Sequence, residues 1–178
     1  MRDLLVATGV PLAAPSANAS GRISPTRAEH VLASLGGRIA LIIDGGATEH
    51  GLESTIVAAA GNGLRLLRPG PIDLGLALAP VDSVQAPGQL RSHYAPTKTL
   101  RLNAIEKQGD EWLIGFGSVL GDAGLSTSGN LLEAAAKLFE RLHEADAAAA
   151  PRIAVASIPE TGLGSAINDR LRRAAAPQ

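Results

Sequence analysis

Residues 11–27 read P-L-A-A-P-S-A-N-A-S-G-R-I-S-P-T-R, and the rest of the chain is organised around this stretch. Leu12–Ala14 predicts a short apolar strand, which runs into a turn of small hydroxyl and amide residues. Ser24 and Pro25 then form a typical helix start, because serine caps helix N-termini and proline suits the first helical position. A strand that leads through a polar turn into a helix is typical of an anion-binding edge.

The residue types in this turn support that expectation. Ser16, Asn18, Ser20 and Ser24 carry short donors for phosphate or carboxylate oxygens, and Gly21 allows a close approach of the backbone. Serine-rich turns are common, however, so the residues alone favour a simpler interpretation in which a surface turn only caps the helix.

Helical and extended patterns alternate before residue 74. Apolar residues spaced three and four apart predict a helix over residues 25–35 that ends at Gly36, and Thr26–Glu29 offers a capping box as a competing start. The continuous apolar run Ile39–Ile43 predicts a buried strand. Before both, Arg2–Ala7 predicts the tail of a helix.

A hairpin is expected next along the chain. Ser54–Ala58 and Leu64–Leu67 bracket Gly61-Asn62-Gly63, which is a good turn sequence. The first segment is therefore predicted to be the end of a mixed α/β sheet. Its polar residues stand at the strand ends, and they are Asp44, Glu53, Ser54 and Arg68.

The composition indicates a globular chain that can build a core. Its 178 residues are 46% hydrophobic and carry a net charge of −1, with an isoelectric point near 6.4. No overall basic field would attract nucleic acid or an anionic membrane, so we expect stable binding to neither. The absence of cysteine excludes disulfides and thiolate metal sites. We expect a cytoplasmic protein.

Residues 98–178 show a second α/β pattern. Alternating strands and helices favour a small parallel, Rossmann-like sheet. Gly115, Gly117 and Gly121 have the wrong spacing for a dinucleotide fingerprint, so they predict tight turns. The expected elements are strands at residues 100–102, 112–116 and 152–158 and helices at about 131–144 and 163–175. In the last helix Arg170, Arg172 and Arg173 lie near the C-terminus, where they would complement the helix dipole.

Between the two parts, residues 71–97 are rich in proline and small residues and lack a sustained period, which is typical of a connector. The predicted division is thus residues 1–73, a linker at 74–97, and a second domain at 98–178. The linker holds Arg91, His93 and Tyr94, the only tyrosine of the chain.

Taken together, these motifs resemble the YrdC-like family, whose two-domain members are threonylcarbamoyl-AMP synthases. The resemblance covers nearly the whole chain. Besides residues 11–26 it rests on I-D-G-G (43–46), G-L-E-S-T-I-V (51–57), L-L-R-P-G (66–70), P-G-Q-L-R-S-H-Y-A-P (87–96) and I-P-E-x-G-L-G-x-A-I-N-D-R-L (158–171).

The resemblance implies a set of binding residues. ATP would contact Ser16, Asn18, Ser24 and Arg68, and threonine would contact Ser54 and the backbone at Ala14. An arginine fork suits phosphate, although without the family motif the residues favour a surface arginine before a Pro-Gly turn at Arg68. For Glu53 the residues alone favour a simpler role, in which it only orients neighbouring hydroxyls. No catalytic side chain and no protein-held metal is assigned.

Two linker residues, His93 and Tyr94, are included with the ATP-binding set. In the two-domain synthases the similar linker folds across the catalytic cleft and can act as a lid. The alternative is an ordered strap between the domains in which Tyr94 packs for stability.

The implied reaction joins L-threonine, bicarbonate and ATP into threonylcarbamoyl-AMP and pyrophosphate, with Mg²⁺ assisting. The product would pass to the machinery that makes threonylcarbamoyladenosine in tRNA. Two alternatives remain: a non-catalytic remnant or half-enzyme that needs an N-terminal partner, and a related carbamoyl-transfer maturation protein.

In the family, a long N-terminal portion precedes the A-P-S-A-N motif, so this chain is expected to match the C-terminal part of such an enzyme. Leu12–Ala14 and Ile39–Ile43 would then expose apolar faces and unpaired strand edges. The isolated chain is therefore predicted to self-associate or to be partly disordered before residue 74.

Overall fold

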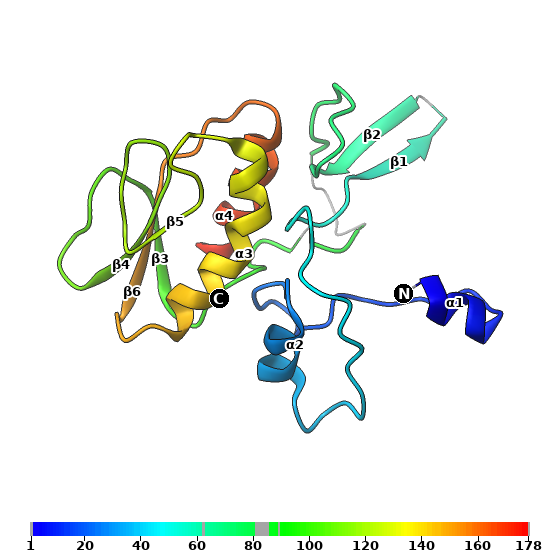
Figure 1. Cartoon of the computed structure of the whole chain (residues 1–178). Helices are drawn as coiled ribbons and strands as arrows, with labels where there is room; N and C mark the ends of the chain where they lie inside the picture. Colours follow the sequence, from blue (N-terminus) through cyan, green and yellow to red (C-terminus); the bar gives the residue numbers. More distant parts are fainter. Residues whose placement is uncertain (1, 62, 81–85, 89, 178) are drawn as a thin grey trace.

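The computed structural model describes residues 2–61, 63–80, 86–88 and 90–177. It confirms the predicted α/β class, with a two-stranded sheet in the first part of the chain and a four-stranded sheet in the second. Figure 1 shows α3 and α4 between the larger sheet and the first part of the chain. The elements are α1 (Arg2–Thr8), α2 (Ala28–Leu35), β1 (Ile56–Ala60), β2 (Gly63–Arg68), β3 (Thr99–Ala104), β4 (Glu111–Gly115), β5 (Ala123–Gly124), α3 (Leu131–Ala147), β6 (Arg152–Ala156) and α4 (Leu163–Ala174).

The larger sheet is parallel, as the sequence predicts, with strand order β3-β6-β4-β5. Side chains alternate across it: Ile153 and Val155 of β6 join the main core with α3 and α4, whereas Ala154 faces a small second cluster. Both helices therefore cover the same face of the sheet. The two-residue strand β5 was not predicted, because so short a segment carries no periodic signal.

Helix α3 follows directly from its sequence. Asn130 caps it by accepting hydrogen bonds from the backbone N–H groups of Leu132 and Glu133, at 2.9 and 3.1 Å. Its buried stripe contains Leu138, Phe139 and Leu142. Leu132, in the first turn of the helix, lies outside this stripe and is 61% exposed.

Two predicted strands in the first part of the chain are wrong. Residues 12–14 and 39–43 are irregular and belong to no strand, and Leu41 and Ile43 are exposed. An apolar run forms a strand only where a neighbouring strand satisfies its backbone groups, and no strand of the described residues pairs with either run.

Helix α2 begins later than the sequence predicts. It starts at Ala28, with Arg27 at the N-cap position and no side-chain cap. Neither Ser24 nor Thr26 caps it: the Ser24 hydroxyl binds Glu53, and Thr26 donates its backbone N–H to the His30 ring. The predicted end is confirmed, since the Gly36 N–H donates to the Leu32 carbonyl at 2.8 Å.

Strands β1 and β2 form the predicted antiparallel hairpin, with a register irregularity between Ile56 and Val57. Asn62 of its turn lies outside the described residues. A turn follows Asp44: the Gly46 N–H donates to Asp44 Oδ1 at 2.8 Å, and Gly46 has φ of 84°.

The first part of the chain packs against the outer side of α3. Ile23 and Leu52 are buried in the same core cluster as Phe139. A Cβ on Gly51 would lie 2.3 Å from the Ala135 carbonyl oxygen, so only glycine allows this loop to approach α3 so closely.

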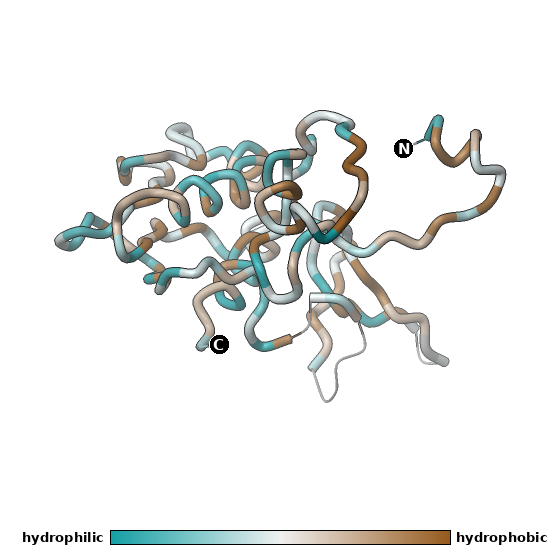
Figure 2. Tube along the Cα trace, turned by 90° about the horizontal axis from the view of Figure 1, so that it is seen from below, coloured by the Kyte–Doolittle hydropathy of each residue, from teal (hydrophilic) through white to brown (hydrophobic). Residues whose placement is uncertain are grey.

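Helix α1, by contrast, extends away from the rest of the chain in both Figure 1 and Figure 2. No helix in the described ranges has the length and apolar character that a membrane span requires.

Candidate functional site

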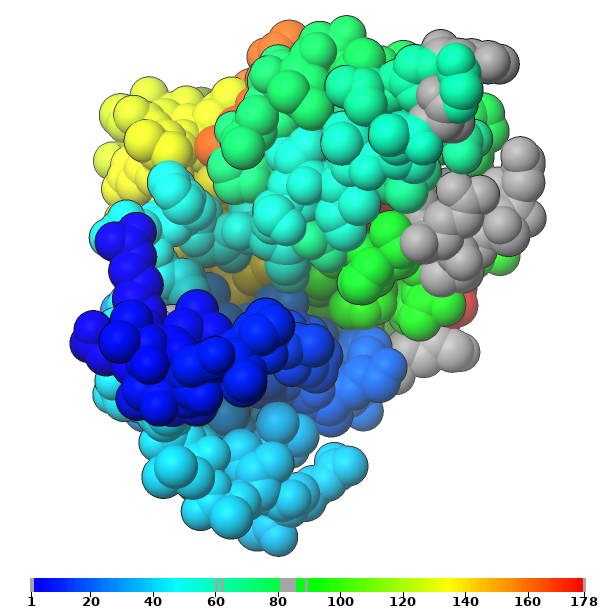
Figure 3. All heavy atoms as spheres, turned by 90° about the vertical axis from the view of Figure 1, so that its right-hand side faces the viewer, coloured from blue at the N-terminus to red at the C-terminus, as the bar shows by residue number. Residues whose placement is uncertain are grey.

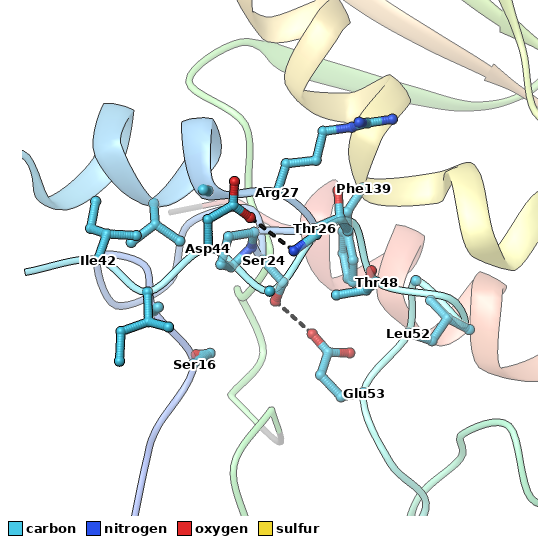
Figure 4. A pocket seen from close by; sticks show the side chains of 18 residues that line it. Ser16, Ser24, Thr26, Arg27, Ile42, Asp44, Thr48, Leu52, Glu53 and Phe139 are labelled. Carbon is cyan, nitrogen blue, oxygen red and sulfur yellow. Dashed lines mark hydrogen bonds between the residues drawn. The ribbon is translucent and has the colours of Figure 1, made fainter. Parts of the chain in front are cut away.

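A cavity of about 410 Å³ lies between the first part of the chain and α3 (Figure 4). Its size falls in the range of about 300–1,000 Å³ that is typical of small-molecule sites. The start of α2 contributes one wall, the loop after residue 41 another, and Phe139 of α3 a third. The lining residues are 16–17, 24–28, 31, 42–46, 48, 51–53 and 139.

Ser24 and Glu53 form the polar centre of this cavity. The Ser24 hydroxyl donates to Glu53 Oε1 at 2.5 Å, the hydrogen bond drawn between them in Figure 4. Bonds of this charge-assisted type are short and strong. Because an ionised carboxylate only accepts hydrogen bonds, the hydroxyl proton of Ser24 is committed to Glu53. In this arrangement Ser24 offers a ligand an acceptor, not the phosphate donor that the sequence analysis expects.

Two loops of the cavity wall are joined by backbone contacts. The Thr48 N–H donates to the Thr26 carbonyl at 3.0 Å, which holds the loop after Asp44 against the start of α2. Arg27 points away from the cavity and pairs with Glu140 of α3, with 2.6 Å between Nη2 and Oε1. The cavity is therefore built from segments far apart in the sequence.

Of the residues predicted from the A-P-S-A-N turn, only some reach the cavity. Ser16 and Ser24 line it. Asn18 lies outside the lining, where its Nδ2 donates to the carbonyls of Ala19 and Arg22 at 3.1 and 3.0 Å. Ala14 is exposed and also outside the lining.

Arg68 and Ser54 contact each other near the end of β2. The buried guanidinium of Arg68 donates from Nε and Nη2 to the Ser54 carbonyl, at 3.1 and 2.9 Å, and from Nη1 to the Pro87 carbonyl, at 3.1 Å. Nη2 also lies 3.3 Å from the Ser54 hydroxyl. Arg68 thus ties β2 to the linker in this structure.

The linker residues His93 and Tyr94 lie against the helices. Tyr94 is 1% exposed and its ring lies 5.5 Å from that of Phe139, so burial raises the pKa of the Tyr94 hydroxyl. His93 donates its backbone N–H to the Arg173 carbonyl at 3.2 Å, and burial lowers the pKa of its imidazole. In this structure, these contacts hold the linker against α3 and α4. Gln89 of the same motif lies outside the described residues.

Comparison with protein families accounts for almost the whole chain. A family described as the C-terminal domain of threonylcarbamoyl-AMP synthase matches residues 72–176, and one described as telomere recombination matches residues 1–70. The chain belongs to the threonylcarbamoyl-AMP synthase family.

Individual relatives agree with this assignment. The chain is 35% identical to threonylcarbamoyl-AMP synthase of Bacillus subtilis and 33% identical to that of Pyrococcus abyssi, with 97% and 92% of the chain aligned. A crystal structure of P. abyssi Sua5 complexed with L-threonine superimposes with a TM-score of 0.81 at 31% identity, covering 97% of this chain. The chain spans 59% and 57% of the length of the two curated relatives.

Arg170 lies beside the site of this threonylcarbamoyl-AMP synthase family member, a position that the sequence did not predict. Arg170, predicted to complement a helix dipole, is fully buried and binds Glu53. The predicted position in the last turn is confirmed for Arg172 and Arg173. It is wrong for Arg170, whose partners are set by the buried face of the helix and not by its end. Arg170 shares the buried face of α4 with Ile167 and Ala174, and a charge inside an apolar stripe is the signal that would have found it.

Proposed function

We propose that the chain binds L-threonine and magnesium–ATP and takes part in the synthesis of threonylcarbamoyl-AMP. In this reaction the threonine amine and bicarbonate form a carbamate with loss of water. A carbamate oxygen then attacks the α-phosphorus of ATP, and pyrophosphate leaves. The product would supply the machinery that modifies tRNA with threonylcarbamoyladenosine, in the cytoplasm.

The main observation behind this proposal is the cavity with the Ser24–Glu53 hydrogen bond at its centre. The chain that forms it superimposes on P. abyssi Sua5 complexed with L-threonine. The chemistry needs no enzyme nucleophile, so positioning of the reactants and stabilisation of phosphate charge would supply the catalysis. Mg²⁺ would enter with the nucleotide as part of the substrate. Within the described ranges, no three acidic or histidine side chains are arranged to hold a metal ion.

The predicted contacts remain part of the proposal. Ser16, Asn18, Ser24 and Arg68 would contact ATP together with His93 and Tyr94, while Ser54 and the Ala14 backbone would contact threonine. Arg68 would exchange its present carbonyl partners for phosphate oxygens when the nucleotide binds, since a guanidinium fork suits both.

The test is an assay of the purified chain with ATP, Mg²⁺, L-threonine and bicarbonate. We expect pyrophosphate release that requires all three substrates, with threonylcarbamoyl-AMP detected by mass spectrometry. Ser24→Ala should reduce kcat/KM about tenfold, the effect of one lost hydrogen bond to the reactants. Ser118→Ala, at an exposed position in the second domain, is the control and should change it less than about twofold.

Other outcomes would support the alternatives. Pyrophosphate release driven by carbamoyl phosphate would favour a carbamoyl-transfer maturation protein. A second candidate function is a half-enzyme, which binds both substrates but turns them over only with a further protein segment. It is considered because the chain spans 59% and 57% of the length of the two curated relatives. Binding without turnover would favour that half-enzyme, and absence of binding would contradict the proposed function.

A further inference from the structure

Arg170 is the most completely buried charged side chain of the structure's described residues, with 0% of its surface exposed. Moving a guanidinium out of water is costly unless carboxylates and further hydrogen bonds compensate it. Here Nε donates to Glu53 Oε2 at 2.9 Å and Nη1 to Asp169 Oδ2 at 3.0 Å. Two carboxylates from different parts of the chain therefore hold this one cation.

The same side chain joins three parts of the molecule. Arg170 belongs to α4, yet Nη1 also donates to the Pro69 carbonyl, just after β2, at 2.8 Å. Its Cζ lies 5.5 Å from the centre of the Tyr94 ring in the linker. Arg173, one turn later, donates to Asp169 and to the Leu90 carbonyl. Helix α4 thus holds the linker and the wall of the cavity with one cluster of charges.

Glu53 transmits this contact to the cavity. One carboxylate oxygen accepts from Arg170 and the other accepts from the Ser24 hydroxyl, so both ends of the carboxylate are fixed. Without Arg170, Glu53 would keep a negative charge beside the cavity with no cation in contact. That charge would repel the phosphates of a nucleotide, and the carboxylate would be free to turn away from Ser24.

We infer that Arg170 is a positioning residue for substrate binding: it fixes and neutralises Glu53, and through Glu53 it keeps the Ser24 oxygen available as an acceptor for a donor group of the ligand, such as the threonine amine or a ribose hydroxyl. This inference rests on the proposed function. It gives α4 of the second domain a role, through Glu53, at a cavity built mainly by the first part of the chain.

The test compares variants of the full chain by calorimetric titration with L-threonine and with a magnesium complex of a non-hydrolysable ATP analogue. Arg170→Gln should weaken binding of at least one ligand about tenfold or more, the usual scale for a lost outer-shell contact. Arg170→Lys keeps the charge and should recover part of this loss. Arg172→Gln is the matched control, because Arg172 lies on the same helix and pairs with Glu160 in an exposed contact.

A double variant separates positioning from stability. Glu53→Gln combined with Arg170→Gln leaves no unpaired buried charge, so it should melt at a higher temperature than Arg170→Gln alone. The affinity loss of the double variant is compared with the losses of Arg170→Gln and Glu53→Gln measured singly. If Arg170 acts through Glu53, the two single losses will not add up in the double variant, since the second substitution removes a contact that the first has already broken. All titrations are made well below the lowest melting temperature. Should Arg170→Gln fail to fold, Arg170→Lys and the double variant still give the comparison.

The possible failures are distinguishable. If the unsubstituted chain binds neither ligand, the proposed function and this inference both fall. If it binds and every Arg170 variant binds equally well, or if the losses simply add, only the positioning role of Arg170 is overturned.

Discussion

Arg170 and Arg172 are two residues apart on one helix, yet one is fully buried and the other has a 55% exposed side chain. A helix turns by 100° per residue, so neighbouring arginines face different surroundings. The sequence shows that Arg170 is charged, and the helical spacing of the apolar residues shows that it lies on the buried face of α4. It does not show that Glu53, 117 positions earlier, meets that face.

Two histidines meet in a similar way where the first part of the chain contacts α3. His30 of α2 and His143 of α3 stack with ring centroids 3.8 Å apart. The pKa of His143 is lowered to about 4, mainly by burial and then by the neighbouring His30. A hydrogen bond between its ring and the Ser24 carbonyl acts in the opposite direction and raises this pKa. Burial also lowers the pKa of His30, although Glu140 opposes this shift. In the folded chain the pKa of each ring therefore lies below that of a free imidazole, which disfavours its charged form.

This pair predicts acid sensitivity. The unfolded chain binds a proton at His143 near pH 6.5 and the folded chain only near pH 4, so the free energy of unfolding should fall as the pH decreases across this window. We expect a loss of about 1–2 kcal/mol after allowance for solvent screening of the partly exposed pair. Urea unfolding at pH 7 and pH 4.5 measures it.

His143→Phe keeps an aromatic ring against His30 and removes the titration, so it should lose less stability over this interval. His50→Gln, in an exposed loop, serves as the control and should behave like the unsubstituted chain. Equal losses in the His143 variant and the unsubstituted chain would contradict the assignment. Nearby charged groups, Arg27, Glu29, Glu140 and Asp146, are unchanged in all three proteins.

At the scale of elements, α3 is the helix on which both halves of the molecule depend. One side carries Leu138 and Leu142 in the core with the sheet, while Glu140 and His143 contact the first part of the chain. Phe139 lies between these sides and reaches the cavity. A loss of packing in α3 should therefore affect the sheet and the cavity together.

Leu138→Ala tests this. Leu138 is 0% exposed, so its truncation should reduce the free energy of unfolding by about 2–5 kcal/mol. Leu132→Ala is the matched control on the same helix, because Leu132 is 61% exposed and should cost less than about 0.5 kcal/mol. Denaturant titration followed by circular dichroism gives both values. Similar costs for the two would mean that α3 does not pack as described.

Hydrophobic periodicity is enough to predict the secondary structure of some elements of this chain but not of others. Helices α3 and α4 and the parallel strands of the second domain follow from patterns that each segment carries itself. The runs at residues 12–14 and 39–43 carry a strand-like pattern as well, but a strand also needs a partner, and a local pattern does not supply one.

For the whole molecule, exposed apolar residues gather in the first part of the chain. Leu12, Leu41 and Ile43 are 46%, 74% and 60% exposed. Figure 3 shows this part of the chain, in blue and cyan, in front of the second domain, and Figure 2 marks its hydrophobic residues in brown. Apolar surface that gathers in one region favours association.

We therefore predict that the isolated chain self-associates or is partly disordered before residue 74. Light scattering after gel filtration should give a mass above 18.1 kDa that rises with concentration, and Leu41→Ser with Ile43→Ser should lower it. Ile105→Ser, at a 78% exposed position in the second domain, is the control and should not. A monodisperse monomer with protected amides throughout the residues before 74 would contradict this prediction.

By itself, the sequence determined the α/β class, the hairpin, the parallel second domain with its amphipathic helices, and the family, because each depends on short-range periodicity or on motifs within one segment. It also pointed to Ser16 and Ser24 at the cavity. Only the tertiary structure decided that Ser24, Glu53 and Arg170 form one chain of hydrogen bonds and that Phe139 closes the cavity wall. These hydrogen bonds link Ser24 to Arg170, 146 positions later, through Glu53. They exist only because α4 and the first part of the chain pack around the same core. No local pattern specifies such an encounter.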